Sequence, residues 1–226
     1  MKIGKYFLVA LVIVLIDQTS KVLVHTYMVE GQTINVLPAD GFARFGFKLH
    51  YLLNPGMAFG IRWESEFGKL ALTLFRLVAM VGIGYYLFKM VHKAHNGFLI
   101  CMGLILGGAV GNVIDSVFYG VFFNNALEGS PTPWFHGQVI DMLYFPLFQF
   151  EWPSWLPILG GKDFLFFSPV FNIADSSIFI GVVLILVFQK RFFAEYDKKT
   201  NPEDQTLSDT SDPSLQEQPT PPTILE

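Results

Sequence analysis

The chain has very little cysteine and very little charge. Its 226 residues include one cysteine, Cys101, and only 15% of them are Asp, Glu, Lys or Arg. A single cysteine excludes a disulfide within the chain, and no His lies near Cys101 in the sequence to activate a thiol nucleophile. We therefore expect Cys101 to be an ordinary packed side chain.

Sequence patterns for a metal site or a nucleic-acid surface are also missing. The five His residues include no helical pair that faces carboxylates, since His92 and His95 lie with Lys93 in a short polar loop. No basic patch with interleaved aromatic residues occurs. The sequence therefore predicts no metal, no cofactor and no nucleic-acid partner.

Apolar runs dominate the chain, which is 52% hydrophobic. A helix of about 20 residues crosses the hydrocarbon core of a bilayer. Four runs reach that length, at 6–28, 70–90, 97–120 and 169–189. A chain this short has too little polar sequence to shield four such helices from water. We predict an all-α membrane protein whose residues 1–192 form a four-helix transmembrane domain.

Positive residues near the ends of these runs predict the orientation in the membrane. Six of them fall on the same side in a four-span topology: Lys2, Lys5, Lys89, Lys93, Lys190 and Arg191. Cytoplasmic loops are enriched in Lys and Arg, so we expect both termini in the cytoplasm. The same topology places two segments, 29–68 and 121–168, outside.

The first external segment carries a β pattern, and the second is rich in Pro, Trp and Phe. Residues 45–53 and 57–61 are predicted strands, with a turn at 54–56 between them. The composition of 121–168 suits the interface between membrane and water. We expect a small external β element and an enlarged second external segment.

The composition changes abruptly after the fourth run. Residues 193–226 contain eight acidic residues and two Lys, a net charge of −6, with many Pro, Thr, Ser and Gln. Such a segment cannot bury a core, and we predict a disordered cytoplasmic tail.

Three carboxylates lie inside or at the edges of the apolar part of the chain, where a charged group is energetically costly. Such residues are functional-site candidates. Asp115 ends the third run, Asp175 lies near the start of the fourth, and Asp141 lies between them. With a helical rise of about 1.5 Å per residue, Asp115 lies roughly 28 Å above Asn96, and Asp175 roughly 24 Å above Arg191. The acids therefore share a depth near the outer surface.

Three polar pairs have spacings that suit one helical face: Asn112 with Asp115, Asn172 with Asp175, and Asp17 with Lys21. The last pair can form a shielded ion pair. Two carboxyls that share one proton can hydrolyse a peptide without a metal, a thiol or a serine, because one activates water while the other polarises the carbonyl. The alternative is a small proton-coupled transporter, although the sequence has no internal repeat.

Five ordered motifs occupy the region from residue 6 to about residue 190. They are Asp17-xxx-Lys21, Asn54-x-Gly56-x-Ala58-Phe59, Gly107-Gly108-xx-Gly111-Asn112-xx-Asp115, Val139-x-Asp141 and Phe171-Asn172-x-Ala174-Asp175. Their combination resembles the bacterial lipoprotein signal peptidases, the signal peptidase II family. The resemblance implies four membrane helices, an external β-cradle and an aspartic dyad at the outer leaflet of the cytoplasmic (inner) membrane. It also implies a monomer, surrounded by membrane lipids, that cleaves prolipoproteins just before a Cys carrying diacylglycerol.

The resemblance assigns the dyad to Asp141 and Asp175. It also implies supporting or substrate-positioning residues: Asn112, Asp115, Asn172, Asn54, Asp17 and Lys21. Two features depart from the family. Ser116 stands where the family usually has Arg, and the intervals around Asp141 are long, which we interpret as insertions at 121–136 and 146–167. The role of Arg76, in the middle of the second run, stays open between a pairing with another polar group inside the bundle and snorkelling to the membrane surface.

Overall fold

The computed structural model describes residues 2–37, 46–56, 66–146, 149–151, 154, 155, 157, 161, 163–165 and 169–193. The helices and strands follow in chain order: α1 (Lys2–Tyr27), β1 (Thr33–Leu37), β2 (Phe47–Asn54), α2 (Glu66–Met90), α3 (Asn96–Ile114), a π-helix (Asp115–Tyr119), α4 (Gly120–Phe122), β3 (Val139–Tyr144), β4 (Gln149–Glu151), β5 (Asp163–Leu165), β6 (Val170–Phe171) and α5 (Ile173–Val187). The predicted acidic tail lies outside the described residues, apart from Phe193.

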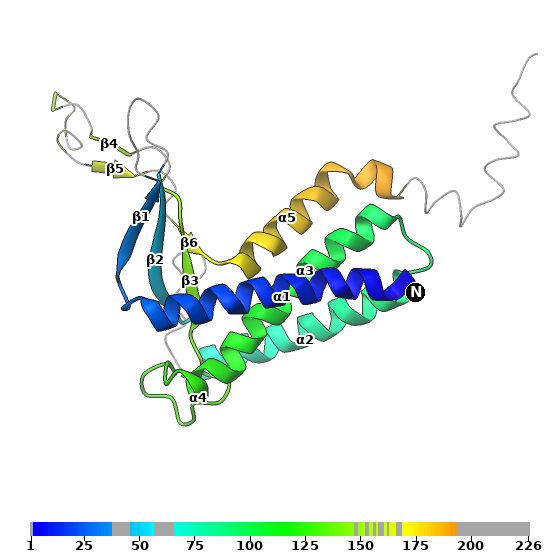
Figure 1. Ribbon diagram of the computed structural model, residues 1–226, viewed down its shortest axis with the longest axis horizontal. Helices are drawn as coiled ribbons and strands as arrows, with labels where there is room; N and C mark the ends of the chain where they lie inside the picture. The colour runs from blue at the N-terminus through cyan, green and yellow to red at the C-terminus, as the bar shows by residue number, and fades with distance from the viewer. Residues whose placement is uncertain are drawn as a thin grey trace, which may run out of the picture.

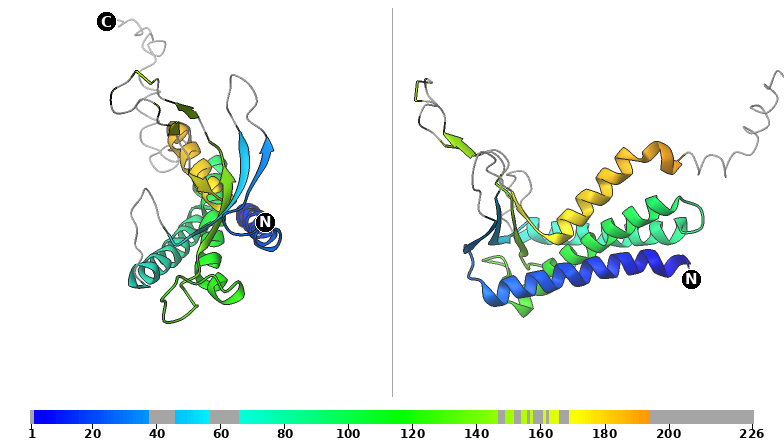
Figure 2. Two further views of the ribbon diagram at one scale, coloured as in Figure 1. Left: turned by 90° about the vertical axis from the view of Figure 1, so that its left-hand side faces the viewer. Right: turned by 45° about the horizontal axis from the view of Figure 1, so that its top comes forward.

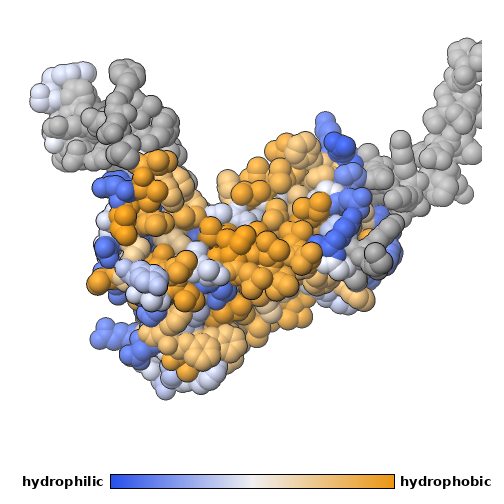
Figure 3. Space-filling view, in the orientation of Figure 1, coloured by the Kyte–Doolittle hydropathy of each residue, from blue (hydrophilic) through white to orange (hydrophobic). Residues whose placement is uncertain are grey.

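Helices α1, α2 and α3 lie alongside one another, with the main sheet at one end (Figure 1). Three helical stretches in the described residues are long and apolar enough to cross a membrane: Gly4–Tyr27, Phe67–Met90 and Asn96–Phe122. They match the first three predicted spans. Figure 3 shows apolar side chains along the helices and hydrophilic ones towards both ends, the distribution expected of a membrane bundle.

The fourth predicted span, 169–189, was wrong at its start. Helix α5 begins at Ile173, because Val170 and Phe171 form β6 and pair with β3. With 15 residues, α5 is about 22 Å long, which is shorter than the hydrocarbon core of about 30 Å. Because β6 ends at Phe171 and α5 begins at Ile173, the N-terminus of the helix lies directly beside the sheet.

The main sheet is antiparallel, with strand order β1-β2-β3-β6 (Figure 2). The predicted strand 45–53 is confirmed in β2, and the turn after it forms when the N–H of Gly56 donates to Asn54 Oδ1 at 2.8 Å. The other predicted strand, 57–61, lies outside the described residues. A largely helical chain with a small β element is confirmed in the described residues, although the sequence did not predict the individual strands β1, β3 and β6.

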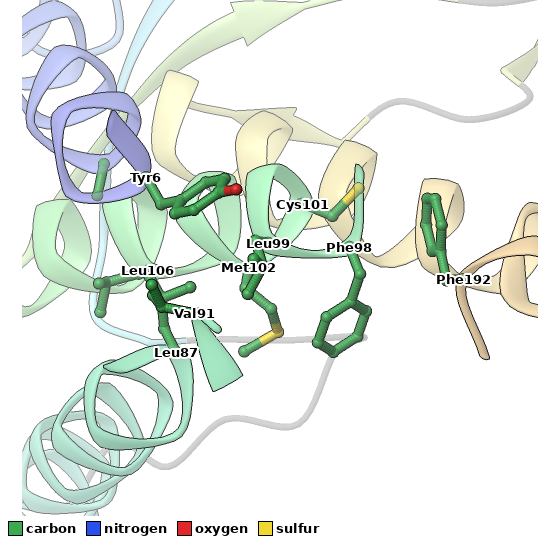
Figure 4. Close-up of a cluster of buried hydrophobic side chains, with 10 residues drawn as sticks. Tyr6, Leu87, Val91, Phe98, Leu99, Cys101, Met102, Leu106 and Phe192 are labelled. Carbon is green, nitrogen blue, oxygen red and sulfur yellow. The ribbon is translucent and has the colours of Figure 1, made fainter. Parts of the chain in front are cut away.

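Two apolar cores hold this arrangement together. The first lies at the end of the bundle far from the sheet and joins α1, α2, α3 and the segment after α5 (Figure 4). Its most buried members are Leu87, Leu99 and Tyr6, and Phe192 is its member from the segment after α5. The second joins the end of α1 to the π-helix and the sheet through Val24, Met28, Tyr51, Tyr119, Ile140 and Met142. The second core therefore fixes β3 against the membrane helices.

Candidate active site

Asp141 belongs to β3, whose alternation separates it from the second apolar core. Ile140 and Met142 point into that core, so Asp141 lies on the opposite face of the strand. Its side chain is 1% exposed, and both carboxyl oxygens have partners. Asn172 Nδ2 donates to Oδ1 at 2.7 Å, and Asn54 Nδ2 donates to Oδ2 at 2.9 Å.

The environment of Asp141 favours its protonated form. Burial raises the pKa of Asp141 to about 7, and the negative charge of Asp175 acts in the same direction, against the hydrogen bonds from Asn54 and Asn172. A carboxyl with this pKa exchanges its proton near neutral pH. It can therefore act as a general acid.

Asp175 lies in the first turn of α5 and is half-buried. Asn172 is the N-cap of this helix, and its Oδ1 accepts the backbone N–H of Asp175 at 2.9 Å. Asn112 Nδ2 donates to Asp175 Oδ1 at 2.7 Å. The amide of Asn172 thus holds the side chain of Asp141 and the backbone of Asp175 at once. The structure brings together all three of these predicted residues and Asn112.

A second polar layer lies next to this pair and centres on Lys21. Lys21 Nζ lies 2.8 Å from Asp17 Oδ2 and 2.6 Å from Asp115 Oδ2, and all three side chains are fully buried. The predicted ion pair of Asp17 and Lys21 is confirmed, with Asp115 as a further partner. Asp17 Oδ1 also accepts the backbone N–H of Ala174 at 2.9 Å, which links the layer to the start of α5. These residues therefore hold α1, the π-helix and α5 in register.

Sequence reasoning missed Gln18, Tyr119 and the π-helix. Gln18 Nε2 donates to Asp115 Oδ1 at 2.9 Å, and Tyr119 donates to Gln18 Oε1 at 2.8 Å. An amide next to Asp17 in an apolar run was an available signal for Gln18. The π-helix over Asp115–Tyr119 left no such signal, although π-helical turns are frequent at functional sites.

The departures from the family pattern also have positions in the structure. Ser116 is fully buried in the π-helix, and its Oγ accepts a hydrogen bond of 3.0 Å from Arg76 Nη1. The segment 121–136, which we interpret as an insertion, folds back against α2, where Thr73 donates to the carbonyl oxygen of Phe135 at 2.9 Å. The segment 146–167, interpreted in the same way, contributes β4 and β5, which pair with each other, and the rest of it lies largely outside the described residues.

The site is a cluster of acidic and amide side chains at the place where an apolar helix bundle meets a sheet. This arrangement is typical of a membrane protein whose function depends on buried carboxyl groups. Comparison with known proteins identifies the family. The profile described as signal peptidase (SPase) II matches residues 9–191. The chain therefore belongs to the signal peptidase II family, which confirms the resemblance and decides against the transporter.

Individual relatives agree with this assignment. The chain is 44% identical to the lipoprotein signal peptidase of Porphyromonas gingivalis over 228 residues, which covers 95% of this chain and 96% of that protein. It is 41% identical to that of Amoebophilus asiaticus over 188 residues, covering 82% and 78%. Two solved structures described as bacterial membrane enzymes share the fold. The first has a TM-score of 0.51 and 24% sequence identity, and the match covers 96% of this chain and 95% of that structure's chain. The second has a TM-score of 0.52 and 26% sequence identity, and the match covers 81% of this chain and 91% of that structure's chain.

Proposed function

We propose that this chain is an aspartic endopeptidase that removes the signal peptide from diacylglyceryl-modified prolipoproteins, with Asp141 and Asp175 as its catalytic pair. The family assignment supports the reaction class, and the names of the relatives support lipoprotein precursors as substrates. One observation carries the choice of residues. The buried carboxyl of Asp141, with a pKa of about 7, is connected through Asn172 to Asp175.

In the proposed reaction, Asp175 acts as the base and Asp141 as the acid. A water molecule attacks the carbonyl carbon before the lipidated Cys and passes a proton to Asp175, while Asp141 donates its proton to the carbonyl oxygen. The resulting tetrahedral diol collapses and the C–N bond breaks: Asp175 gives its proton to the amine of the Cys, and a hydroxyl of the diol gives a proton back to Asp141. The sum is the consumption of one water molecule, and the pair returns to one shared proton.

The position of the pair suits a substrate held in the membrane. Asp141 lies in the sheet and Asp175 at the adjoining end of α5, so both are at the end of the bundle opposite the α2–α3 loop (Figure 1). That loop and the end of α5 carry Lys93, Lys190 and Arg191, which favours a cytoplasmic location for them. We therefore place both termini in the cytoplasm of a bacterium and the site at the outer leaflet of the inner membrane, in a monomer with α5 as the fourth membrane helix.

The remaining polar residues have supporting roles in this proposal. Asn54 and Asn172 orient Asp141, and Asn112 orients Asp175. The layer of Asp17, Lys21 and Asp115 holds the start of α5 and the π-helix against α1, and so positions the residues around the pair. It does not exchange protons with the substrate. In this proposal, the layer with Asp141 and Asp175 carries out the reaction, and the layer with Lys21 only stabilises the structure around it.

Purified Asp141→Asn and Asp175→Asn variants, assayed on a lipidated prolipoprotein, test the pair. Each is expected to fold and to lose at least about 10³-fold in kcat, the scale of acid–base catalysis and nucleophile activation combined. Glu128→Gln is a matched control, because Glu128 is an exposed carboxylate in the 121–136 insertion. Full activity in either Asp variant would refute the assignment of the pair.

A further inference from the structure

Arg76 is a charged residue in the middle of α2, a helix that exposes much of its apolar surface. Phe75 and Val78, beside it in the sequence, are 70% and 71% exposed, as expected for side chains that face lipid. Arg76 itself is partly buried and turns towards the π-helix, where its Nη1 donates to Ser116 Oγ. A charge at this depth is costly, and the proposed mechanism has not used it.

The charged groups around Arg76 come from four elements. Three are carboxyls: Asp175 on α5, Asp115 on the π-helix and Asp141 on β3, and all three attract the guanidinium. The fourth charged group is Lys69, which lies two turns before Arg76 on the same side of α2 and repels it. Arg76 therefore lies within electrostatic range of both members of the proposed pair, and Ser116 holds it there.

The carboxyls of the site outnumber Lys21, the cation that forms salt bridges with them, and this favours a further cation at this place. Lys21 lies between two carboxylates, Asp17 and Asp115, so its single positive charge does not balance them. The proposed pair adds one more negative charge when it shares a proton. In the water-poor edge of a membrane, an unbalanced negative charge favours uptake of a second proton, and a fully protonated pair has no base.

We propose that Arg76 is a positioning residue for the catalytic pair: fixed by Ser116, it supplies the positive charge that keeps Asp141 and Asp175 singly negative at neutral pH. This inference rests on the proposed function, because it requires that these two acids do the chemistry. Arg76 has five N–H donors, and a hydrogen bond from one of them to the neutral Ser116 leaves its positive charge uncompensated there, so that it acts on the carboxyls of Asp175, Asp115 and Asp141.

The test is the pH profile of cleavage by the full chain in lipid or detergent, with Arg76→Met, Arg76→Lys and a control. Arg76→Met is expected to lose at least tenfold in kcat at pH 6–7, with the acid limb of its profile moved up by about one pH unit. Arg76→Lys restores the position of the acid limb. Lys89→Met removes a cation from the cytoplasmic end of the same helix and leaves rate and profile unchanged.

An Arg76→Met profile that superposes on that of the parent, or an Arg76→Lys profile displaced as far as that of Arg76→Met, would overturn the proposal in favour of a structural role. If Arg76→Met does not fold, the double variant Arg76→Ala with Ser116→Lys keeps the test open, because Nη1 and Oγ are only 3.0 Å apart. A folded double variant with the parental acid limb supports the proposal, and one with a displaced limb refutes it. Failure of the pair itself is a separate result, namely full activity in Asp141→Asn or Asp175→Asn.

Discussion

Asn172 Nδ2 donates a hydrogen bond of 2.7 Å to Oδ1 of Asp141, across 31 residues of sequence. The same side chain caps α5 through its Oδ1, which accepts the N–H of Asp175. One amide therefore performs two tasks: it starts a helix and connects the two proposed catalytic carboxyls. The geometry of the pair depends on where α5 begins.

The two tasks of Asn172 can be separated by substitution. Asn172→Ala removes the cap and the connection, and we expect a loss of about 1 kcal/mol in the free energy of unfolding together with a fall of roughly 100-fold in kcat. Asn172→Ser restores a good cap, but its hydroxyl is too short to reach Asp141. Thermal unfolding in detergent and kcat measure the two effects. Recovery of kcat together with stability in Asn172→Ser would show that only the cap matters.

The raised pKa of Asp141 predicts a dependence of stability on pH. The folded state binds this proton more tightly than the unfolded state, so its contribution to stability is complete below about pH 4 and is lost as the pH rises through about 7. The loss amounts to about 4 kcal/mol. Asp141→Asn cannot ionise, and its melting temperature should exceed that of the parent at pH 8 but not at pH 4. An equal difference at both pH values would contradict the raised pKa.

Asn54 should set the position of the alkaline limb of activity. Its hydrogen bond to Asp141 Oδ2 favours the charged carboxylate, so its removal raises the pKa of Asp141 further above its ordinary value. Since Asp141 is the proposed acid, Asn54→Ala should move the alkaline limb of kcat/KM to higher pH. Asn35→Ala is a matched control, because Asn35 is an exposed amide in β1. An unmoved alkaline limb would argue against Asp141 as the acid.

The sequence predicted the membrane helices and most of the polar residues, because both depend on local composition. Asp17 and Lys21 are four apart on one helix, and their ion pair follows from that spacing alone. The contact of Arg76 with Ser116 joins residues 40 apart, and the π-helix changes the direction of side chains after Asp115. Neither follows from a sequence pattern: the contact depends on how α2 packs against the π-helix, and the π-helix has no local sequence signal. The start of α5 was misplaced for a similar reason, because pairing with β3 turned an apolar pair into a strand.

Gly108 should be essential for the position of α5. A Cβ at this residue would collide with the carbonyl oxygen of Ala174 and lie 2.6 Å from Ser177 Oγ, at the first turn that carries Asp175. The backbones of α3 and α5 can separate here only by moving Asp175, one of the two proposed catalytic carboxyls. Gly108→Ala should therefore lower both stability, by about 1–3 kcal/mol, and kcat. Gly82→Ala, on α2, meets nothing within 4 Å and should be neutral or stabilising by up to about 1 kcal/mol. Thermal unfolding and kcat of the two variants, measured in the same detergent, provide the comparison; parental kcat in Gly108→Ala would mean that the α3–α5 contact does not position Asp175.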